Sequence, residues 1–198
     1  RPADAVARRV RWHQAVGRDA VHRPLDAAAL GRVAPFREIA TAAASHAEHL
    51  AAPALGARPA AGTLEALGPE PHPVQVLVSD GLSAAAVHHV VPDLLPLLAA
   101  GLAARGIGVG APILARHGRV KLAEPVGERL GADLVIHLIG ERPGGDAAAA
   151  RSLSAYLVYR IPEGERDAAA RASGHAGIRH EVTVISNISS CGLPPVEA

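Results

Sequence analysis

The fold is indicated most directly by the stretch Val74-Gln-Val-Leu-Val78, which is followed by Ser79-Asp-Gly-Leu-Ser83. A short β-branched apolar run of this kind is typical of a strand buried on both faces. Ser83 is a good helix N-cap, because its hydroxyl can accept an N–H of the first turn, and the alanine- and leucine-rich residues after it predict a long helix. Pro92 and Pro96 should interrupt or kink that helix.

The same alternation of strand and helix continues toward the C-terminus. Further strands are predicted at Ile107–Ala115, Leu134–Ile139, Leu153–Tyr159 and Val182–Ile188. A helix is predicted over Val120–Leu130, ended by a C′ glycine at Gly131. This alternation is typical of an α/β domain, so we expect a Rossmann-like, mostly parallel sheet with flanking helices. The first three strands, at 74–78, 107–115 and 134–139, should be parallel neighbours, because their crossovers are right-handed.

The first third of the chain predicts a different organisation. Residues Pro35–Leu50 predict a helix that begins near Pro35, with its apolar side chains on one face. Prolines and glycines then punctuate the chain, which places a domain boundary near Gly68–Pro73. We therefore expect an N-terminal helical region over residues 1–70 and a Rossmann-like domain over residues 71–198.

Composition and charge exclude several classes of protein. The chain has 198 residues, of which 49% are hydrophobic and 20% charged, and its net charge is +1. These values are ordinary for a globular protein and exclude the strongly basic surface that binds nucleic acid. The longest apolar stretch, around Val90–Ala104, is broken by Pro92, Asp93 and Pro96, so no membrane-spanning helix is predicted. The single cysteine, Cys191, excludes an internal disulfide and fits a reducing compartment.

Three loops rich in glycine and polar residues follow the predicted parallel strands. They are residues 79–81, 116–120 and 140–144. Ligands of open α/β sheets bind at the carboxyl ends of the strands, so these loops are candidates for one binding face. Such loops need glycine and polar residues in any case, and the pattern alone leaves both interpretations open.

Well-known catalytic motifs are absent from the sequence. It contains no dinucleotide-binding, P-loop or nucleophile-elbow pattern. Cys191 has no evident histidine partner. His46 and His49 could share a helix face, but no acidic or thiol residue lies near them in sequence, so we expect no metal site. From its residues alone, the sequence therefore predicts a binding subunit and not a complete enzyme, with no catalytic residues assigned.

Several blocks of the sequence stand out together, in one order and with one spacing. They are VLVSDGLSA at 76–84, GRVK at 118–121, VGERLGA at 126–132, LIGERPG at 138–144, SLSAY at 152–156, ISNI at 185–188 and PPVEA at 194–198. Through these blocks, residues 74–198 resemble the small (light) subunit of ethanolamine ammonia-lyase. The first seventy residues are similar to it more loosely, through the stretches beginning at Arg11 and Phe36.

This resemblance implies a partner, a cofactor and a reaction. The family's enzyme depends on adenosylcobalamin, with cobalt held in the corrin, and converts ethanolamine to acetaldehyde and ammonia. Its large subunit is a (β/α)₈ barrel that carries most catalytic groups, and the small subunit covers the cobalamin at the interface. The resemblance further implies a hetero-oligomer without nucleic acid or membrane. We expect a cytoplasmic location, with a bacterial microcompartment as the alternative.

Carried over position by position, the family's cobalamin contacts fall on Val120 and Glu141. The third contact, usually a cysteine, is Val184 here, and the arginine expected two residues earlier is Val182. Alternatives are an ion pair with Arg142 or another arginine for Glu141, and ordinary helix-start packing for Val120. The rival interpretation of the chain is a stand-alone α/β ligand-binding or scaffold module without catalysis.

Overall fold

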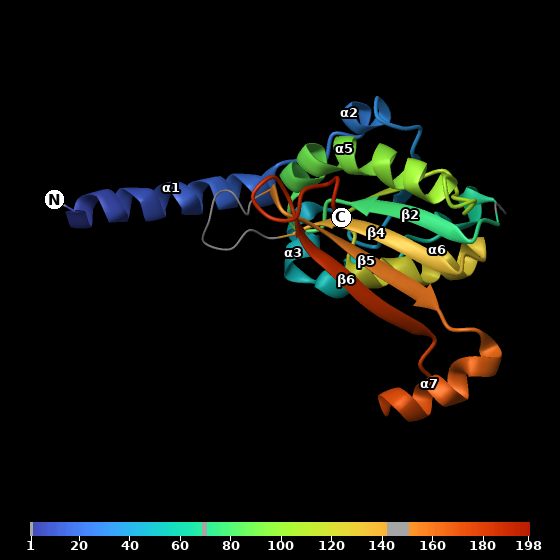
Figure 1. The fold of residues 1–198 in the computed structure, drawn as a ribbon. Helices are drawn as coiled ribbons and strands as arrows, with labels where there is room; N and C mark the ends of the chain where they lie inside the picture. Colours follow the sequence, from blue (N-terminus) through green and yellow to red (C-terminus); the bar gives the residue numbers. More distant parts are fainter. Residues whose placement is uncertain (1, 69–70, 142–150) are drawn as a thin grey trace.

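A computed structural model of the chain describes residues 2–68, 71–141 and 151–198 (Figure 1). Its strands form one six-stranded sheet in the order β1-β3-β2-β4-β5-β6. The strands are β1 Arg37–Ala40, β2 Val74–Ser79, β3 Ile113–Arg116, β4 Leu134–Gly140, β5 Leu153–Arg160 and β6 His180–Ile188. The α-helices are α1 Pro2–His22, α2 Ala27–Gly31, α3 His46–Ala51, α4 Pro53–Gly56, α5 Ala84–Ala103, α6 Ala123–Leu130 and α7 Arg166–Ser173. Short 3₁₀ segments lie at η1 Glu65–Leu67, η2 Val120–Leu122 and η4 Glu163–Glu165.

The centre of the sheet is parallel, as the sequence predicts. β2 pairs in parallel with β3, where Leu77 lies opposite Ile113, and with β4, where Val74 lies opposite Leu134. The prediction that these three strands are parallel neighbours is therefore confirmed. β5 runs antiparallel to β4, and β6 antiparallel to β5, so the sheet as a whole is mixed.

Helices cover both faces of the sheet, which explains why the central strands are mostly apolar. On one face α5 packs Val87 and Val91 into a core that includes Val76 of β2 and Leu138 of β4. On the other face η2 and α6 contribute to a second core with Leu77 and the remaining inward residues of β3 and β4. Every residue of β2 is buried. A strand enclosed in this way is mostly apolar, and its buried polar side chains, Gln75 and Ser79, are hydrogen-bonded.

Helix α5 begins as predicted, with the Ser83 hydroxyl accepting the N–H of Ala86 at 3.1 Å. It then continues through Pro92 and Pro96, which do not interrupt it. By length and composition α5 could cross a membrane, but here it is a core helix that packs residues such as Val87 and Val90 against the sheet. The packing of its apolar face holds the helix together where each proline removes one backbone hydrogen bond.

The third strand is shorter than predicted. β3 covers only Ile113–Arg116, and of the preceding residues only Val109 forms an isolated bridge, to Val74. Residues 107–112 contain Gly108, Gly110 and a proline, which weaken a regular ladder. The Gln75 amide donates to Ala111 O at 2.8 Å and so replaces part of the missing pairing.

The predicted helix over Pro35–Leu50 is wrong. Arg37–Ala40 is the edge strand β1, paired in parallel with β3, and the helix α3 begins only at His46 after its N-cap Ser45. In β1 only Ile39 is buried, and this one inward residue is enough once a neighbouring strand supplies the hydrogen bonds. The segment before residue 70 thus adds a strand to the sheet, and α1 extends away from it (Figure 1). A domain boundary near 68–73 stays a prediction.

Candidate functional site

The loops after β2, β3 and β4 meet at the carboxyl edge of the sheet. Asp80, directly after β2, accepts the backbone N–H of His117 at Oδ1 over 2.6 Å. The N–H of Leu82 donates to Gly140 O at the end of β4 over 2.8 Å. The three loops predicted from the sequence are therefore brought together as far as Glu141. Residues 142–144 lie outside the described part of the chain.

Glycines allow these loops to approach so closely. A Cβ built on Gly118 would lie 2.6 Å from Ser79 Cβ, and one built on Gly140 would collide with the carbonyl oxygen of Ser83. His117 takes a positive φ of 60°, which is uncommon for a residue other than glycine. The bond from its N–H to Asp80 holds it in that conformation, and the turn that carries Val120 is fixed as a result.

His137 on β4 fixes the position of Val120. Its side chain is fully buried, with Nδ1 3.4 Å from Val120 O and Nε2 2.7 Å from Ser79 Oγ. A carbonyl can only accept, so Nδ1 carries the proton and the Ser79 hydroxyl donates to Nε2. Burial lowers the pKa of His137 to about 4, so the ring is neutral at pH 7. The carbonyl of Val120 is therefore tied to β4, and Val120 itself opens η2 and is half-buried.

Glu141 lies one residue beyond β4 and is held by β5. Its backbone N–H donates to Ser152 O at 3.1 Å, and its Oε1 accepts the hydroxyl of Tyr156 at 3.0 Å. Burial and the Glu141 carboxylate together raise the pKa of the Tyr156 hydroxyl. Burial lowers the pKa of the Arg119 guanidinium. The negative charges of Glu141 and Asp80 raise that pKa and so oppose the lowering. Arg119 thus lies close enough to both carboxylates to interact with their charges.

Val184 lies on β6, level with Tyr156 and His137 in the sheet. In the sheet register His137 is opposite Tyr156, and Tyr156 is opposite Val184. Directly opposed residues place their side chains on the same face of a sheet. Val184 is 46% exposed, because α6 covers β4 and β5 on this face while β6 forms the edge.

The three sequence-predicted positions are therefore linked through two residues that the sequence reasoning did not identify. His137 holds Val120, and Tyr156 connects Glu141 with Val184. One signal for His137 was available, because it is the one polar side chain inside the apolar run Leu134–Ile139. Tyr156 has no such signal, since only the register of β5 shows which strand positions it faces.

A cluster of histidines lies beside this site. His49 is fully buried, and its Nε2 is 2.7 Å from Gly81 O, while its ring centroid is 5.6 Å from that of His117 and 6.2 Å from that of His46. Burial lowers the pKa of His49 to about 4 and raises that of Asp80 to about 6. The described residues contain no group of three or more histidine, cysteine or acidic side chains that could hold a metal ion.

A comparison with protein families now adds to this geometry. The family model of the ethanolamine ammonia-lyase light chain (EutC) matches residues 2–198. The chain belongs to the ethanolamine ammonia-lyase light chain family. The resemblance inferred from separated blocks is thereby confirmed, and the match extends through the first seventy residues, which the blocks covered only loosely.

Membership of the ethanolamine ammonia-lyase light chain family has two direct consequences. The family is that of a subunit of a lyase, and a light chain implies a large partner subunit. Val120 and Glu141 lie at the carboxyl edge of the sheet, after β3 and β4, whereas Val184 lies within β6.

Proposed function

We propose that this light chain works with its large subunit to convert ethanolamine to acetaldehyde and ammonia, and that it contributes Val120, Glu141 and Val184 to an adenosylcobalamin site between the two chains. Family membership supports the reaction and the partner. The single observation that supports the site is the Glu141–Tyr156–Val184 arrangement, in which Tyr156 on β5 stands between a carboxylate at the end of β4 and a half-exposed apolar side chain on β6.

The residues present fit such a group. A corrin ring is rimmed by amides whose N–H groups donate, and a carboxylate only accepts. The bond from Tyr156 occupies one of about four lone-pair sites of Glu141, so the carboxylate can accept an amide as well. Val184 offers apolar surface, and Val120 opens a helical segment whose first N–H groups have no partner within the segment. Cobalamin supplies the radical chemistry when bound, and this chain orients and encloses it.

The parallel arrangement of β3, β2 and β4 also supports a Rossmann-like sheet, which we infer for the domain that begins near residue 71. We infer a cytoplasmic location, with a microcompartment as the alternative. The rival function is a stand-alone α/β binding or scaffold module, which would need neither a large subunit nor a corrin.

Copurification tests the proposal against its rival. The chain is co-expressed with its large subunit, and the complex is examined for the absorption spectrum of bound cobalamin. We expect a stable complex that retains the corrin. Glu141→Ala should weaken cobalamin binding about ten- to hundredfold, since a hydrogen bond to a charged group contributes about 1.5–3 kcal/mol. The exposed Glu163 gives a control, Glu163→Ala, which should bind normally. A chain that binds neither partner nor corrin would establish the rival.

A further inference from the structure

Tyr156 occupies the centre of the proposed cofactor site without being one of its three assigned residues. It lies opposite Val184 in the β5–β6 register and donates its hydroxyl to Glu141 Oε1 over 3.0 Å. On its other side it lies opposite His137, which holds Val120. Glu141 is therefore hydrogen-bonded to Tyr156 and Val184 is its strand partner, while Val120 is connected to it through His137.

We propose that Tyr156 is the positioning residue of this site, and that its hydroxyl holds the Glu141 carboxylate in the orientation that receives a corrin amide. This inference rests on the proposed function. Glu141 stands one residue beyond the end of β4, where the strand no longer restricts its side chain. A glutamate side chain loses rotamer freedom when it binds a ligand, and a bond made beforehand reduces that cost.

Tyr156 can do this because two constraints fix its own position. Its backbone is paired on both sides, to β4 and to β6, and its ring packs against the core that lies under α6. Glu141 remains the flexible member of the pair. A hydrogen bond to an ionised carboxylate is stronger than one between neutral groups, so the Tyr156 hydroxyl can hold the Glu141 side chain in place.

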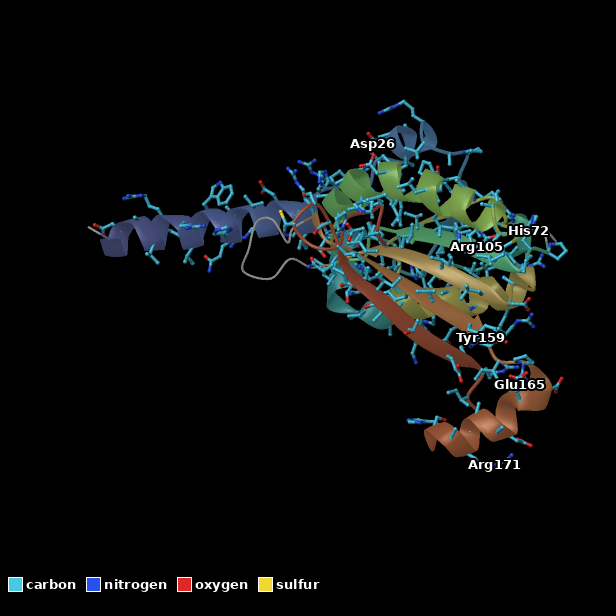
Figure 2. All side chains as sticks on the ribbon, viewed as in Figure 1. Asp26, His72, Arg105, Tyr159, Glu165 and Arg171 are labelled. Atoms are coloured by element: carbon cyan, nitrogen blue, oxygen red, sulfur yellow. The ribbon has the colours of Figure 1, made fainter. Side chains whose placement is uncertain are left out.

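The chain contains its own matched control. It has two tyrosines, and the second, Tyr159, is 40% exposed and lies three residues further along β5, toward the end of the strand near η4 (Figure 2). Tyr159 lies opposite Leu134 and Glu181, so it faces away from His137 and Val184. Tyr159→Phe removes a hydroxyl from the same strand without touching the site.

The first test measures the pairing of the two side chains without any cofactor. In the Tyr159→Phe chain, Tyr156 is the sole tyrosine, and its ionisation is followed by absorbance or by ¹³Cζ NMR. We expect the Tyr156 ionisation to move to lower pH when Glu141→Gln is added, because the carboxylate that opposes a phenolate is gone. An identical titration with and without Glu141→Gln would overturn the inference.

The second test measures positioning in the complex with the large subunit. Tyr156→Phe should weaken cobalamin binding about three- to tenfold, as expected for one hydrogen bond, and Tyr159→Phe should not. In a Glu141→Ala background Tyr156→Phe should cause no further loss, because the residue acts through Glu141. An equal loss in both backgrounds would refute the inference.

The two tests separate the inference from the function on which it rests. If Glu141→Ala weakens binding while the titration shows no coupling, the cofactor site stands and the role of Tyr156 is refuted. If the titration shows coupling while Glu141→Ala binds cobalamin normally, the cofactor site at Glu141 is refuted, and the positioning role is refuted with it.

Discussion

His137 shows how much one buried polar side chain contributes to this site. It stands in an apolar strand, fully buried, with both ring nitrogens occupied by Ser79 and Val120. Its neutral form is the one that fits, because the Ser79 hydroxyl needs an unprotonated nitrogen to donate to. The conformation of the Val120 turn is therefore linked to the protonation state of a residue on a different strand.

Acid should destabilise the fold through His137. Its pKa in the folded chain, about 4, lies below the ordinary value of 6.5, so the unfolded chain takes up the proton first. Neutral His137 therefore contributes about 3 kcal/mol to the free energy of unfolding. This contribution is complete above about pH 6.5 and is lost as the pH falls toward about 4. Urea unfolding at pH 7 and pH 5 should therefore show a smaller change in the free energy of unfolding between the two pH values for His137→Gln than for the wild type. The exposed His175 gives the control His175→Gln, and equal pH slopes in all three proteins would contradict the prediction.

Val184 tests whether shape or sulfur chemistry matters at the third position. A free cysteine behaves mostly as a small apolar side chain close to valine in size. Val184→Cys should therefore change cobalamin affinity by less than about 1 kcal/mol. Val184→Asp should weaken binding much more, by placing an unpaired charge against the corrin. Cofactor titration of the assembled complex measures both, with the exposed neighbour Thr183→Asp as the control. Normal binding by Val184→Asp would show that residue 184 does not contact the cofactor.

At the scale of elements, the sequence was informative where one local signal decided the structure. β2 and β4 are mostly apolar runs, and α5 has an N-cap serine, so their positions follow from local chemistry. β1 was predicted as a helix, because its four residues become a strand only through pairing with β3, which is distant in sequence. The same holds within the site. Resemblance supplied Val120, Glu141 and Val184, whereas Tyr156 and His137 acquire their roles from strand register, which no local pattern contains.

The turn between β3 and η2 is held by a hydrogen bond to Asp80, the residue directly after β2. Asp80→Ala removes the acceptor for the His117 N–H and should reduce the free energy of unfolding by about 1–3 kcal/mol. Asp80→Asn keeps an acceptor oxygen and should lose less. Burial raises the pKa of Asp80 to about 6, so its ionisation costs stability increasingly from about pH 4 to pH 6, and asparagine avoids that cost. Urea unfolding at pH 7 measures both variants, and an equal loss for Asn and Ala would contradict the role of the acceptor.

On the scale of the whole molecule, the candidate site is one-sided. Val184 lies on an edge strand, Glu141 is only half-buried, and α1 extends away from the sheet (Figure 1). Reactive intermediates need an enclosure that excludes water. Within the described residues this edge of the sheet is open, and the large subunit that a light chain implies is the partner expected to complete the enclosure.

The isolated chain should therefore have no lyase activity. The candidate site is open on one side, and His49 in the neighbouring cluster is fully buried with one nitrogen already bonded to the carbonyl of Gly81, so it is not accessible to a substrate. Ethanolamine and adenosylcobalamin are incubated with the purified chain, with the large subunit alone, and with both together, and acetaldehyde is measured by a coupled reduction. Acetaldehyde should form only when both subunits are present. Turnover by this chain alone would show that its own residues suffice for the reaction, and the partner would then have a role other than completing the site.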